Sequence, residues 1–551
     1  MALLPALRTS QLPSNNPTCI ALFKALPGKV SLPNSNGYSA SVKSYFSLQE
    51  AEITPYCVVS PENEQDVSAA IKILAAPDST TKFAVRGGGH TVWKGSANIE
   101  DGVTIDMRAI NAVDVSGDKT VTSVGAGALW RDVYSVLDAM GLATSGGRAA
   151  QVGVGGLTTG GGLSFFSARF GFVCDNVLSF DIVLADGTLV SANATSHPDL
   201  WVALRGGSNN FGVVTRFHLR TFPQAPFYGG QVFYQIETAP QQIDAFAKLA
   251  GAADFDENAS LITSFSYTAQ GGAIQNSLKY PSTTLNTKPA VFQPFFDIGS
   301  QLGQTMRVSN VTDFTTEQGA FSPDGFRQLY RTTTFKNSRP FLDRVYTLWD
   351  TTIPLIKPIA GIQWALSIQP IPPLITSRSG PLGGNSLGLS PTSDGPLVNC
   401  LLTATWNNTA DDILAQNTAV RLFDDIEKEA RVQNKPSLYH PYKYLNYADG
   451  SQDVIGGYGP EVKKRLRDVS RKYDPRGVFQ RQVPGGFKLW TPQELVVGDR
   501  GRRRRVRREV FPFLEGTTCI YAWSGIRWSF SSRLGRGVRN QGGQDDIRHR
   551  S

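Results

Sequence analysis

The chain has 551 residues, more than one hydrophobic core usually holds, and this length predicts two to four domains. Its composition, 41% hydrophobic and 18% charged, is that of an ordinary globular protein, and no apolar run reaches the ~20 residues of a membrane span. Residues 491–551 hold 13 arginines and 6 acidic residues and so contribute +7 of the net charge of +8. The near-neutral remainder gives no electrostatic reason to expect a nucleic acid or a membrane as partner.

Strand and helix signals alternate densely from about residue 50 to residue 224. The run Cys57-Val-Val-Ser60 predicts a strand, and Ser60 is expected to cap a helix that has Pro61 at its first position. Asp186-Gly187 lies between two apolar runs and predicts a hairpin. The other elements expected here are helices at 19–26, 129–140 and 198–204, and strands at 83–85, 103–107, 120–124 and 212–222.

The pattern changes between residues 225 and 433. Strand-like runs at 231–236, 261–267 and 400–406 mix with helices such as 413–432, and a loop rich in proline, glycine and serine covers 370–396. This mixture predicts a separate α+β domain with a pocket built from loops. Compact signals return at 434–489, with a strand expected at Tyr444–Tyr447 and a helix at 460–472.

The five cysteines are too few for a disulfide scaffold and lack metal-ligand spacing. Cys19 and Cys57 either form a disulfide, which would imply an oxidising compartment, or are two separate buried thiols. Four N-x-Ser/Thr sequons are compatible with secretion, whereas Pro5 and Arg8 interrupt the hydrophobic region that a signal peptide needs. A secreted and a cytoplasmic location both stay open.

The C-terminal segment 491–551 contains the basic run Arg502–Arg508 and little periodic pattern. One interpretation is an arm for nuclear localisation or nucleic-acid binding. The other, which we favour, is a disordered or mispredicted C-terminal extension, for instance from the reading through of an unspliced segment.

Glycine is concentrated between Gly146 and Gly162, where eight of seventeen residues are glycine. Because glycine weakens helices and strands, this density indicates that backbone approaches a flat ligand closely. The alternative is a flexible linker, but hydrophobic residues interleave with these glycines, and a solvated linker would carry serine and charge instead.

A second glycine run, Arg86-Gly-Gly-Gly-His90, directly follows a predicted strand. Its N–H groups are placed to bind a pyrophosphate, as in an anion-binding nest. The run is not the G-x-G-x-x-G fingerprint of the doubly wound fold, and the chain has no P-loop motif either. A lone histidine is more often structural than reactive, but the position of His90 between two glycine clusters favours a functional role.

Eight motifs together resemble the berberine-bridge-enzyme-like branch of the oxygen-dependent FAD-linked oxidoreductases, the flavoproteins of the vanillyl-alcohol-oxidase type. The resemblance covers about residues 19–489, and its specificity comes from the order of the motifs. They are Arg86-Gly-Gly-Gly-His90, Gly125-Ala-Gly127, Val152-Gly-Val-Gly-Gly156, Gly160-Gly-Gly162, Asp175-Asn-Val177, Leu204-Arg-Gly-Gly-Ser-Asn-Asn-Phe-Gly212, Tyr444-Leu-Asn-Tyr447 and Tyr473-Asp-Pro-Arg-Gly-Val-Phe479.

The resemblance implies an α+β fold: a PCMH-type FAD-binding domain of two α/β subdomains, with a substrate domain of antiparallel sheet plus helices. The implied parts are an N-terminal segment 1–51, the FAD-binding domain 52–224, the substrate domain 225–433, a C-terminal segment 434–489 that completes the FAD-binding domain, and the tail 491–551.

The resemblance further implies FAD attached through its 8α-methyl group to His90. Ala149 stands where some members have a second, cysteinyl anchor, so His90 is expected to be the only covalent attachment. Val152 matches a position where small residues leave room for O₂. The expected cofactor-binding residues are Arg86, Gly87, Gly88, Gly89, His90, Gly125, Gly127, Val152, Gly153, Gly155, Gly156, Gly160, Gly161, Gly162, Asn446 and Tyr447.

Tyr444 and Tyr447 are the candidate catalytic residues. On a strand their side chains point to opposite faces, and either phenol, with a pKa lowered near the cofactor, would help to deprotonate a substrate O–H or N–H group. Core aromatics with hydrogen-bonded hydroxyls are an equally valid interpretation. Plant members of the family use a carboxylate base from the substrate domain, and the sequence does not identify its counterpart.

The predicted function is an oxidase that transfers a hydride from a small organic molecule to FAD, with O₂ as the final acceptor, in a setting that resembles fungal secondary metabolism. The alternatives are a carbohydrate or alcohol dehydrogenase with another electron acceptor, and a non-catalytic flavin-binding secreted protein.

Overall fold

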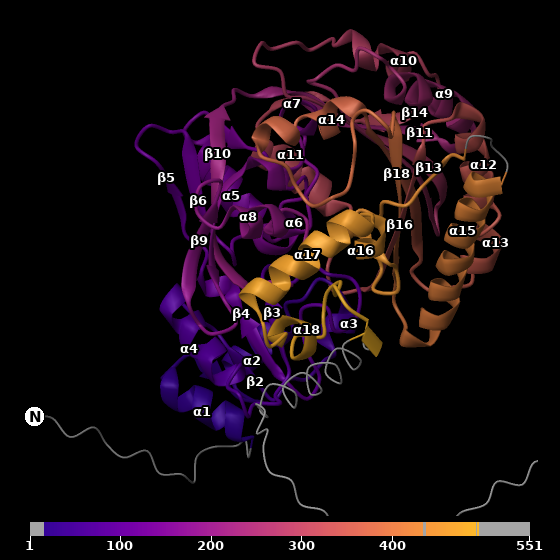
Figure 1. The fold of residues 1–551 in the computed structure, drawn as a ribbon. Coiled ribbons are helices and arrows are strands. Elements are labelled where there is room, and N and C mark those ends of the chain that lie inside the picture. Colours follow the sequence, from indigo (N-terminus) through magenta and orange to yellow (C-terminus); the bar gives the residue numbers. More distant parts are fainter. Residues whose placement is uncertain (1–15, 433–436, 492, 495–551) are drawn as a thin grey trace, which may run out of the picture. The chain divides into compact units, whose positions relative to one another are not determined.

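Three β-sheets organise the part of the chain that the computed structural model describes, namely residues 16–432, 437–491 and 493–494 (Figure 1). The chain divides into two units, Met1–Thr491 and Pro492–Ser551, and nearly all described residues belong to the first. The interpretations of the segment 491–551 therefore concern residues outside the described ones.

The first sheet carries strands in the order β1-β2-β4-β3, and β2, β4 and β3 run parallel. A disulfide between Cys19 on α1 and Cys57 on β2 ties the N-terminal segment to this sheet. The elements of this layer are α1 (Pro17–Ala25), β1 (Val30–Ser31), α2 (Asn36–Val42), α3 (Leu48–Ala51), β2 (Cys57–Val59), α4 (Glu64–Leu74), β3 (Phe83–Arg86) and β4 (Val103–Asp106).

Helix α4 begins three residues later than the sequence predicts. The backbone N–H of Ser60 donates to Lys29 O, so this residue extends the pairing of β1 and β2 instead of capping a helix. Asn63 is the N-cap, and its side chain accepts a hydrogen bond of 2.9 Å from Asp66 N. An Asn cap satisfies one of the free N–H groups of the first turn, which fixes the start of the helix there.

The second sheet is antiparallel, with the order β5-β6-β10-β8-β9 and β7 paired to β10. The hairpin predicted at Asp186-Gly187 is confirmed, because β8 pairs with β9 across this turn. The elements are β5 (Val113–Val115), β6 (Val121–Gly125), α5 (Trp130–Asp138), β7 (Leu142–Thr144), α6 (Val154–Thr159), α7 (Ser167–Phe170), β8 (Val177–Val183), β9 (Leu189–Asn193), α8 (Pro198–Leu204) and β10 (Val213–Pro223).

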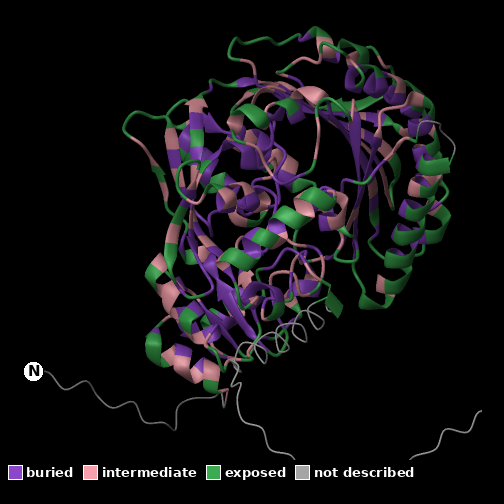
Figure 2. Cartoon of the chain, viewed as in Figure 1, coloured by how far each residue is buried: buried purple, intermediate pink, exposed green. Residues whose placement is uncertain are grey.

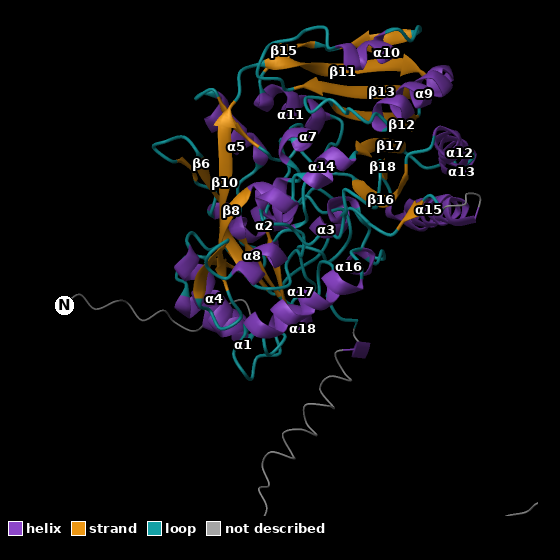
Figure 3. Cartoon of the chain, turned by 45° about the horizontal axis from the view of Figure 1, so that its top comes forward, coloured by secondary structure: helices purple, strands orange, loops and turns teal. Residues whose placement is uncertain are grey.

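The third sheet is also antiparallel and follows the order β14-β11-β13-β12-β17-β18-β16-β19, with β15 paired to β11 (Figure 3). Its strands are β11 (Phe227–Gln235), β12 (Ser260–Thr268), β13 (Gly271–Tyr280), β14 (Gln301–Gln304), β15 (Arg307–Ser309), β16 (Arg327–Lys336), β17 (Gln363–Ile371), β18 (Leu397–Trp406) and β19 (Tyr439–His440). Its helices are α9 (Ala239–Ala250), α10 (Gln293–Phe296), α11 (Val311–Ala320), α12 (Arg339–Asp350), α13 (Ile353–Ile356), α14 (Pro373–Ser377) and α15 (Asp412–Val432).

Side chains of the third sheet alternate between a helix-covered core and the opposite face. Leu366 and Ile368 of β17 and Leu402 of β18 belong to a core that includes buried residues of α9, α12 and α15. The outer surface of α15 is exposed (Figure 2). The period of two residues along each strand therefore turns the intervening side chains, many of them polar, to the other face of the sheet.

The C-terminal segment packs against the first two sheets. Phe83 N on β3 donates to Gln482 O, and the Phe83 ring meets that of Phe479 edge-on. The helices here are α16 (Val454–Gly457), α17 (Pro460–Tyr473) and α18 (Val478–Arg481). In the described part of the chain no helix combines the length and the apolar character needed to cross a bilayer.

Candidate active site

A cavity of about 420 Å³ is lined by three parts of the chain that are distant in sequence. The loop after β3 and the segment around Gly153 contribute backbone, the third sheet contributes small polar side chains, and the C-terminal segment contributes aromatic residues. Its volume is in the range of cofactor and substrate pockets. Ten of the sixteen expected cofactor-binding residues and both candidate catalytic tyrosines line it.

The two glycine runs meet at the cavity. A side chain on Gly88 would lie 2.5 Å from Gly153 Cα, and a side chain on Gly155 would lie 2.9 Å from Ala126 O. Only glycine permits backbone to approach backbone this closely. Of the expected residues, Gly87, Gly88, Gly89, His90, Val152, Gly153, Gly155, Gly156, Asn446 and Tyr447 line the cavity.

Other glycines of the predicted cofactor set serve internal packing. A side chain on Gly125 would meet Ile110 O at 2.3 Å, and one on Gly127 would meet Met107 O at 1.9 Å. Gly160, Gly161 and Gly162 likewise face protein atoms, and Gly162 N donates to Asn446 Oδ1 at 3.1 Å. These five glycines are absent from the cavity lining. Their density in the sequence reflects tight packing behind the cavity as well as contact with it.

His90 is held between the glycine loop and an aromatic ring. Its imidazole stacks on Phe46 with ring centroids 3.8 Å apart, and Phe46 N donates to Gly89 O at 3.0 Å. Burial lowers the pKa of His90 to about 4, so the ring is neutral at physiological pH. Its Nε2 atom is buried without a hydrogen-bond partner among the described residues. A neutral histidine with an unsatisfied nitrogen in a glycine-lined cavity fits a flavin as its missing partner.

The segment Tyr444–Tyr447 differs from the predicted strand, because Leu445–Tyr447 forms a single 3-10 turn. Tyr444 and Tyr447 consequently lie close together, with ring centroids 4.7 Å apart, instead of on opposite faces of a strand. Asn446 ties the turn to the glycine segment by donating to Gly156 O and Leu157 O, both at 3.2 Å. These tertiary hydrogen bonds override the strand preference of the local sequence.

The environments of the two tyrosines differ. Burial raises the pKa of Tyr444 well above its usual range, so the lowered value expected from the sequence is wrong for this residue. Tyr447 is partly accessible, and its hydroxyl accepts a hydrogen bond of 2.8 Å from Arg148 Nη2. The same Nη2 donates to Gln369 Oε1 at 2.6 Å. Of the two tyrosines, Tyr447 is therefore the one whose hydroxyl accepts a hydrogen bond from the Arg148 guanidinium.

Small polar side chains of the third sheet form one wall of the cavity. Ser264 on β12 and Ser367 on β17 are register partners, and their hydroxyl oxygens lie 2.7 Å apart. Ser266, Gln275, Gln369 and Thr403 line the same wall. Sequence reasoning missed these residues and Arg148, although the polar alternation of Ile262-Thr-Ser-Phe-Ser266 and Ala365-Leu-Ser-Ile-Gln369 was a usable signal of a strand with one polar face.

Comparisons with known proteins agree with this site. Residues 55–193 match the family model of an FAD binding domain. The FAD-dependent monooxygenase sdcF of Emericella nidulans is 36% identical over 477 residues, which cover 86% of this chain and 98% of the relative. The oligopeptidase PhomG' of Diaporthe leptostromiformis is 38% identical over 469 residues, and this match covers 84% of the chain but only 36% of that longer protein.

The solved structure of BBE-like 1 from Physcomitrella patens superposes with a TM-score of 0.68 at 19% identity, covering 86% of this chain and 100% of the other. The chain belongs to the same family of FAD-dependent enzymes as sdcF, and its fold is that of the berberine-bridge-enzyme-like protein. It is an FAD-linked oxidoreductase, and the predicted α+β fold with a PCMH-type FAD-binding domain is confirmed.

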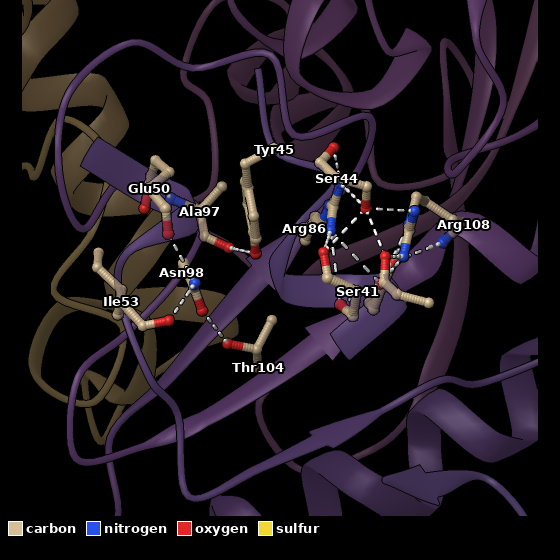
Figure 4. Close-up of polar contacts among 12 residues, drawn as sticks. Ser41, Ser44, Tyr45, Glu50, Ile53, Arg86, Ala97, Asn98, Thr104 and Arg108 are labelled. Atoms are coloured by element: carbon tan, nitrogen blue, oxygen red, sulfur yellow. Dashed lines mark hydrogen bonds and ion pairs between the residues drawn. The ribbon is translucent and has the colours of Figure 1, made fainter. Parts of the chain in front are cut away.

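Arg86 is absent from the cavity lining, and its side chain lies among Ser41, Ser44, Tyr45 and Arg108 (Figure 4). Its guanidinium stacks on the Tyr45 ring at 3.8 Å and donates to Ser44 O at 2.6 Å. Asp106 lies 3.8 Å away and supplies the counter-charge. The contacts of Arg86 are thus with the N-terminal segment and β4, and we now expect it to position the loop that carries His90 instead of touching the cofactor.

Glu50 supports the same loop from the other side (Figure 4). Its carboxylate accepts hydrogen bonds from Ala97 N at 2.7 Å and Gly95 N at 3.1 Å, and Ala97 lines the cavity. Burial raises the pKa of Glu50 to about 7, although these N–H donors oppose the shift. The N-terminal segment therefore holds the loop in two ways: it binds the buried guanidinium of Arg86, and it contributes the buried carboxylate of Glu50.

The raised pKa of Glu50 predicts a pH-dependent stability. Between its ordinary value of 4.5 and about 7, the folded protein binds the proton more tightly than the unfolded chain. Glu50 therefore stabilises the fold fully below that window, and the contribution, at most about 3 kcal/mol, is lost as the pH rises through it. Thermal unfolding of wild type and Glu50→Gln from pH 4.5 to 8 should show a smaller slope in the variant. Glu100→Gln, at the surface of the same loop, is the control; equal slopes in wild type and Glu50→Gln would contradict the assignment.

No cysteine lines the described cavity. Ala149 lies in its wall, while Cys174 and Cys400 are buried elsewhere, and burial raises the pKa of both thiols. In the described residues no group of histidine, cysteine or acidic side chains is arranged to hold a metal ion. His90 is the one histidine among the described lining residues.

Proposed function

We propose that this chain is an oxidase that carries FAD covalently on His90 and oxidises a small organic molecule, with O₂ as the final electron acceptor. One observation carries the proposal: the neutral His90 and the Arg148–Tyr447 pair line the same cavity. A row of aromatic contacts connects them, because Phe46 stacks on His90 and meets Tyr330, which in turn meets Tyr447.

The residues that line the cavity suggest which parts of the chain hold the cofactor and which bind the substrate. Gly87–His90 and Val152–Gly156 are positioned to hold the cofactor by backbone contacts, with the N-terminal segment fixing the loop. Bound FAD supplies the hydride acceptor and the route for electrons to O₂. The polar wall of β12, β17 and β18 orients the substrate by hydrogen bonds.

Tyr447 is the group that we propose to accept the proton from the substrate. Arg148 Nη2 donates to its phenol oxygen at 2.8 Å, which fixes this oxygen in the cavity that the substrate would enter. No carboxylate belongs to the described lining, so the counterpart of the carboxylate base of plant members is not in this cavity. Tyr444, buried against Tyr447, positions it.

The proposed domain division has FAD-binding residues 52–224 and 434–489 on one side and substrate residues 225–433 on the other. Two separate cores support it, one containing buried residues of the first two sheets and α17, the other containing those of the third sheet with α9, α12 and α15. Val311 and Phe314 of α11 belong to the first core, so this helix joins the two parts.

Reaction with O₂ is proposed to depend on the size of residue 152. Val152 lines the cavity, and its carbonyl accepts from Trp130 N at 3.0 Å, which fixes the backbone there. Val152→Leu should slow reoxidation by O₂ about tenfold, as a steric barrier of about 1.4 kcal/mol would. Stopped-flow mixing of the anaerobically reduced enzyme with O₂ measures this step. Reduction by substrate, measured separately, should be unchanged, and equal reoxidation rates in both proteins would argue against an O₂ path beside Val152.

Monooxygenation is the second candidate, because the relative from Emericella nidulans is named an FAD-dependent monooxygenase. An oxidase releases H₂O₂ and leaves the oxygen content of the product unchanged, whereas a monooxygenase transfers one atom of O₂ to the product. Turnover under ¹⁸O₂, with peroxide and product mass measured in one sample, separates the two. A dehydrogenase with another acceptor would show slow reoxidation, and a non-catalytic flavin carrier would show no reduction by any compound of a broad substrate screen.

A further inference from the structure

The charge of the cavity lining is uneven. Arg148 is the one cationic side chain among the described lining residues, and neither an aspartate nor a glutamate accompanies it. His90, the other basic side chain there, has a pKa of about 4 because it is buried, and it carries no charge at physiological pH. The remaining polar groups are hydroxyls and amides. The cavity therefore has a net positive charge before any ligand enters.

The guanidinium of Arg148 is only partly satisfied by the protein. Both of its hydrogen bonds start from Nη2 and end on neutral groups, Gln369 Oε1 at 2.6 Å and Tyr447 Oη at 2.8 Å. Among the described residues no carboxylate lies within ion-pair distance of Arg148, unlike Arg307 and Arg327 of the same chain, which each contact two acidic side chains. A partly buried charge without a counter-ion is costly unless a ligand supplies the missing anion.

Aromatic groups share the cavity lining with this charge. Tyr447 contacts Arg148, Tyr330 meets Tyr447 edge-on with centroids 6.3 Å apart, and Phe321 lies in the cavity lining while being 41% exposed. Such rings provide flat apolar surface for a conjugated ligand. Arginine, with its planar fork of donors, is suited to a carboxylate or another oxygen that shares negative charge over a planar group.

We propose that the substrate carries an acidic oxygen on a planar conjugated framework, as a phenol, an enol or a carboxylic acid does, and that Arg148 binds this oxygen in its anionic form. This rests on the proposed function, because it names the substrate class of the same site. A protonated amine is disfavoured, since it would face Arg148 in a cavity without a carboxylate to neutralise it.

The test uses the flavin-loaded enzyme and four ring compounds of similar size: benzoate, 4-cyanophenolate, benzyl alcohol and benzylammonium. Binding is measured by titration calorimetry and by the change in flavin absorbance, neither of which needs turnover. We expect the wild type to prefer the two anions, and Arg148→Met to weaken their binding about 10- to 100-fold, the usual loss of a hydrogen bond to a charged group. Arg148→Lys, which keeps the charge, should recover part of the affinity. Benzoate represents a carboxylate substrate and 4-cyanophenolate a phenolate substrate. The one whose affinity falls more in Arg148→Met indicates which kind of oxygen Arg148 binds.

Arg131→Gln is the matched control, because Arg131 is exposed, absent from the cavity lining and paired with Asp132. It should leave all four affinities unchanged. Equal binding of the anions to wild type and Arg148→Met, or tighter binding of benzylammonium than of benzoate, would overturn the inference. The outcome is independent of the proposed oxidase function: anion binding that depends on Arg148 in a protein that reduces no flavin would refute only the function, and turnover without anion preference would refute only this inference.

Discussion

Replacing His90 with alanine is expected to remove all acid-stable flavin from the polypeptide. The imidazole is the nitrogen nucleophile of the described cavity lining, and its Nε2 lacks a partner within the protein. Alanine offers no atom for a covalent bond, so FAD would be held, if at all, by backbone contacts alone. The measurement is flavin fluorescence in the acid-precipitated pellet, compared with the supernatant, for wild type and His90→Ala.

The control for this experiment is a histidine outside the cavity. His218 on β10 bonds to Ser123 at 2.8 Å and Asp181 at 2.9 Å and is absent from the lining. His218→Ala should retain the covalent flavin of wild type. Release of all flavin from the wild-type protein by acid would show that the covalent attachment does not exist, whatever the variants do.

Tyr447→Phe is expected to slow flavin reduction by the substrate by a factor on the order of 10² to 10⁴, the usual contribution of a positioned general base. The variant keeps the ring that packs against Tyr444 and Tyr330 and removes only the oxygen that Arg148 contacts. Anaerobic stopped-flow spectroscopy isolates this step from the reaction with O₂. The amount of bound flavin should not change.

Tyr444→Phe is the matched variant, because it makes the same change in the neighbouring ring. Burial raises the pKa of Tyr444, which keeps its phenol protonated, so its loss should slow flavin reduction by much less. Equal losses in both variants would assign the proton transfer to neither tyrosine alone.

Local sequence predicted most elements well where a short-range signal exists. The Asp186-Gly187 turn marks the β8–β9 hairpin, because few residues other than glycine adopt a φ of +83°. The helix signals of the sequence located α5, α8 and α17, although the ends of α5 and α17 differ from the predicted ones by one or two residues. The start of α4 was placed wrongly because Ser60 and Asn63 are both good caps, and only the pairing of β1 with β2 decides between them.

Only some residues of the candidate site could be predicted from the sequence. The glycine-histidine run could be predicted because its residue types are constrained by close backbone approach at the cavity. Arg148 could not, since a single arginine among 54 basic residues carries no local signal. The assignment of Arg86 to the cofactor was reasonable from its neighbours in sequence, yet its long side chain turns to Asp106 and Tyr45, which no local rule anticipates.

By itself the sequence determined the family and FAD as the cofactor, and it singled out His90, which the structure places in the cavity lining, because glycines and short motifs record local backbone requirements directly. The tertiary structure alone decided that Arg148 donates its hydrogen bond to Tyr447 and not to Tyr444, that polar side chains of the third sheet line the cavity, and that no acidic side chain is in the described lining with Arg148. These features depend on contacts between residues 148, 369 and 447. Long-range packing sets the charge and exposure of such residues, so their chemistry appears only when the chain is folded.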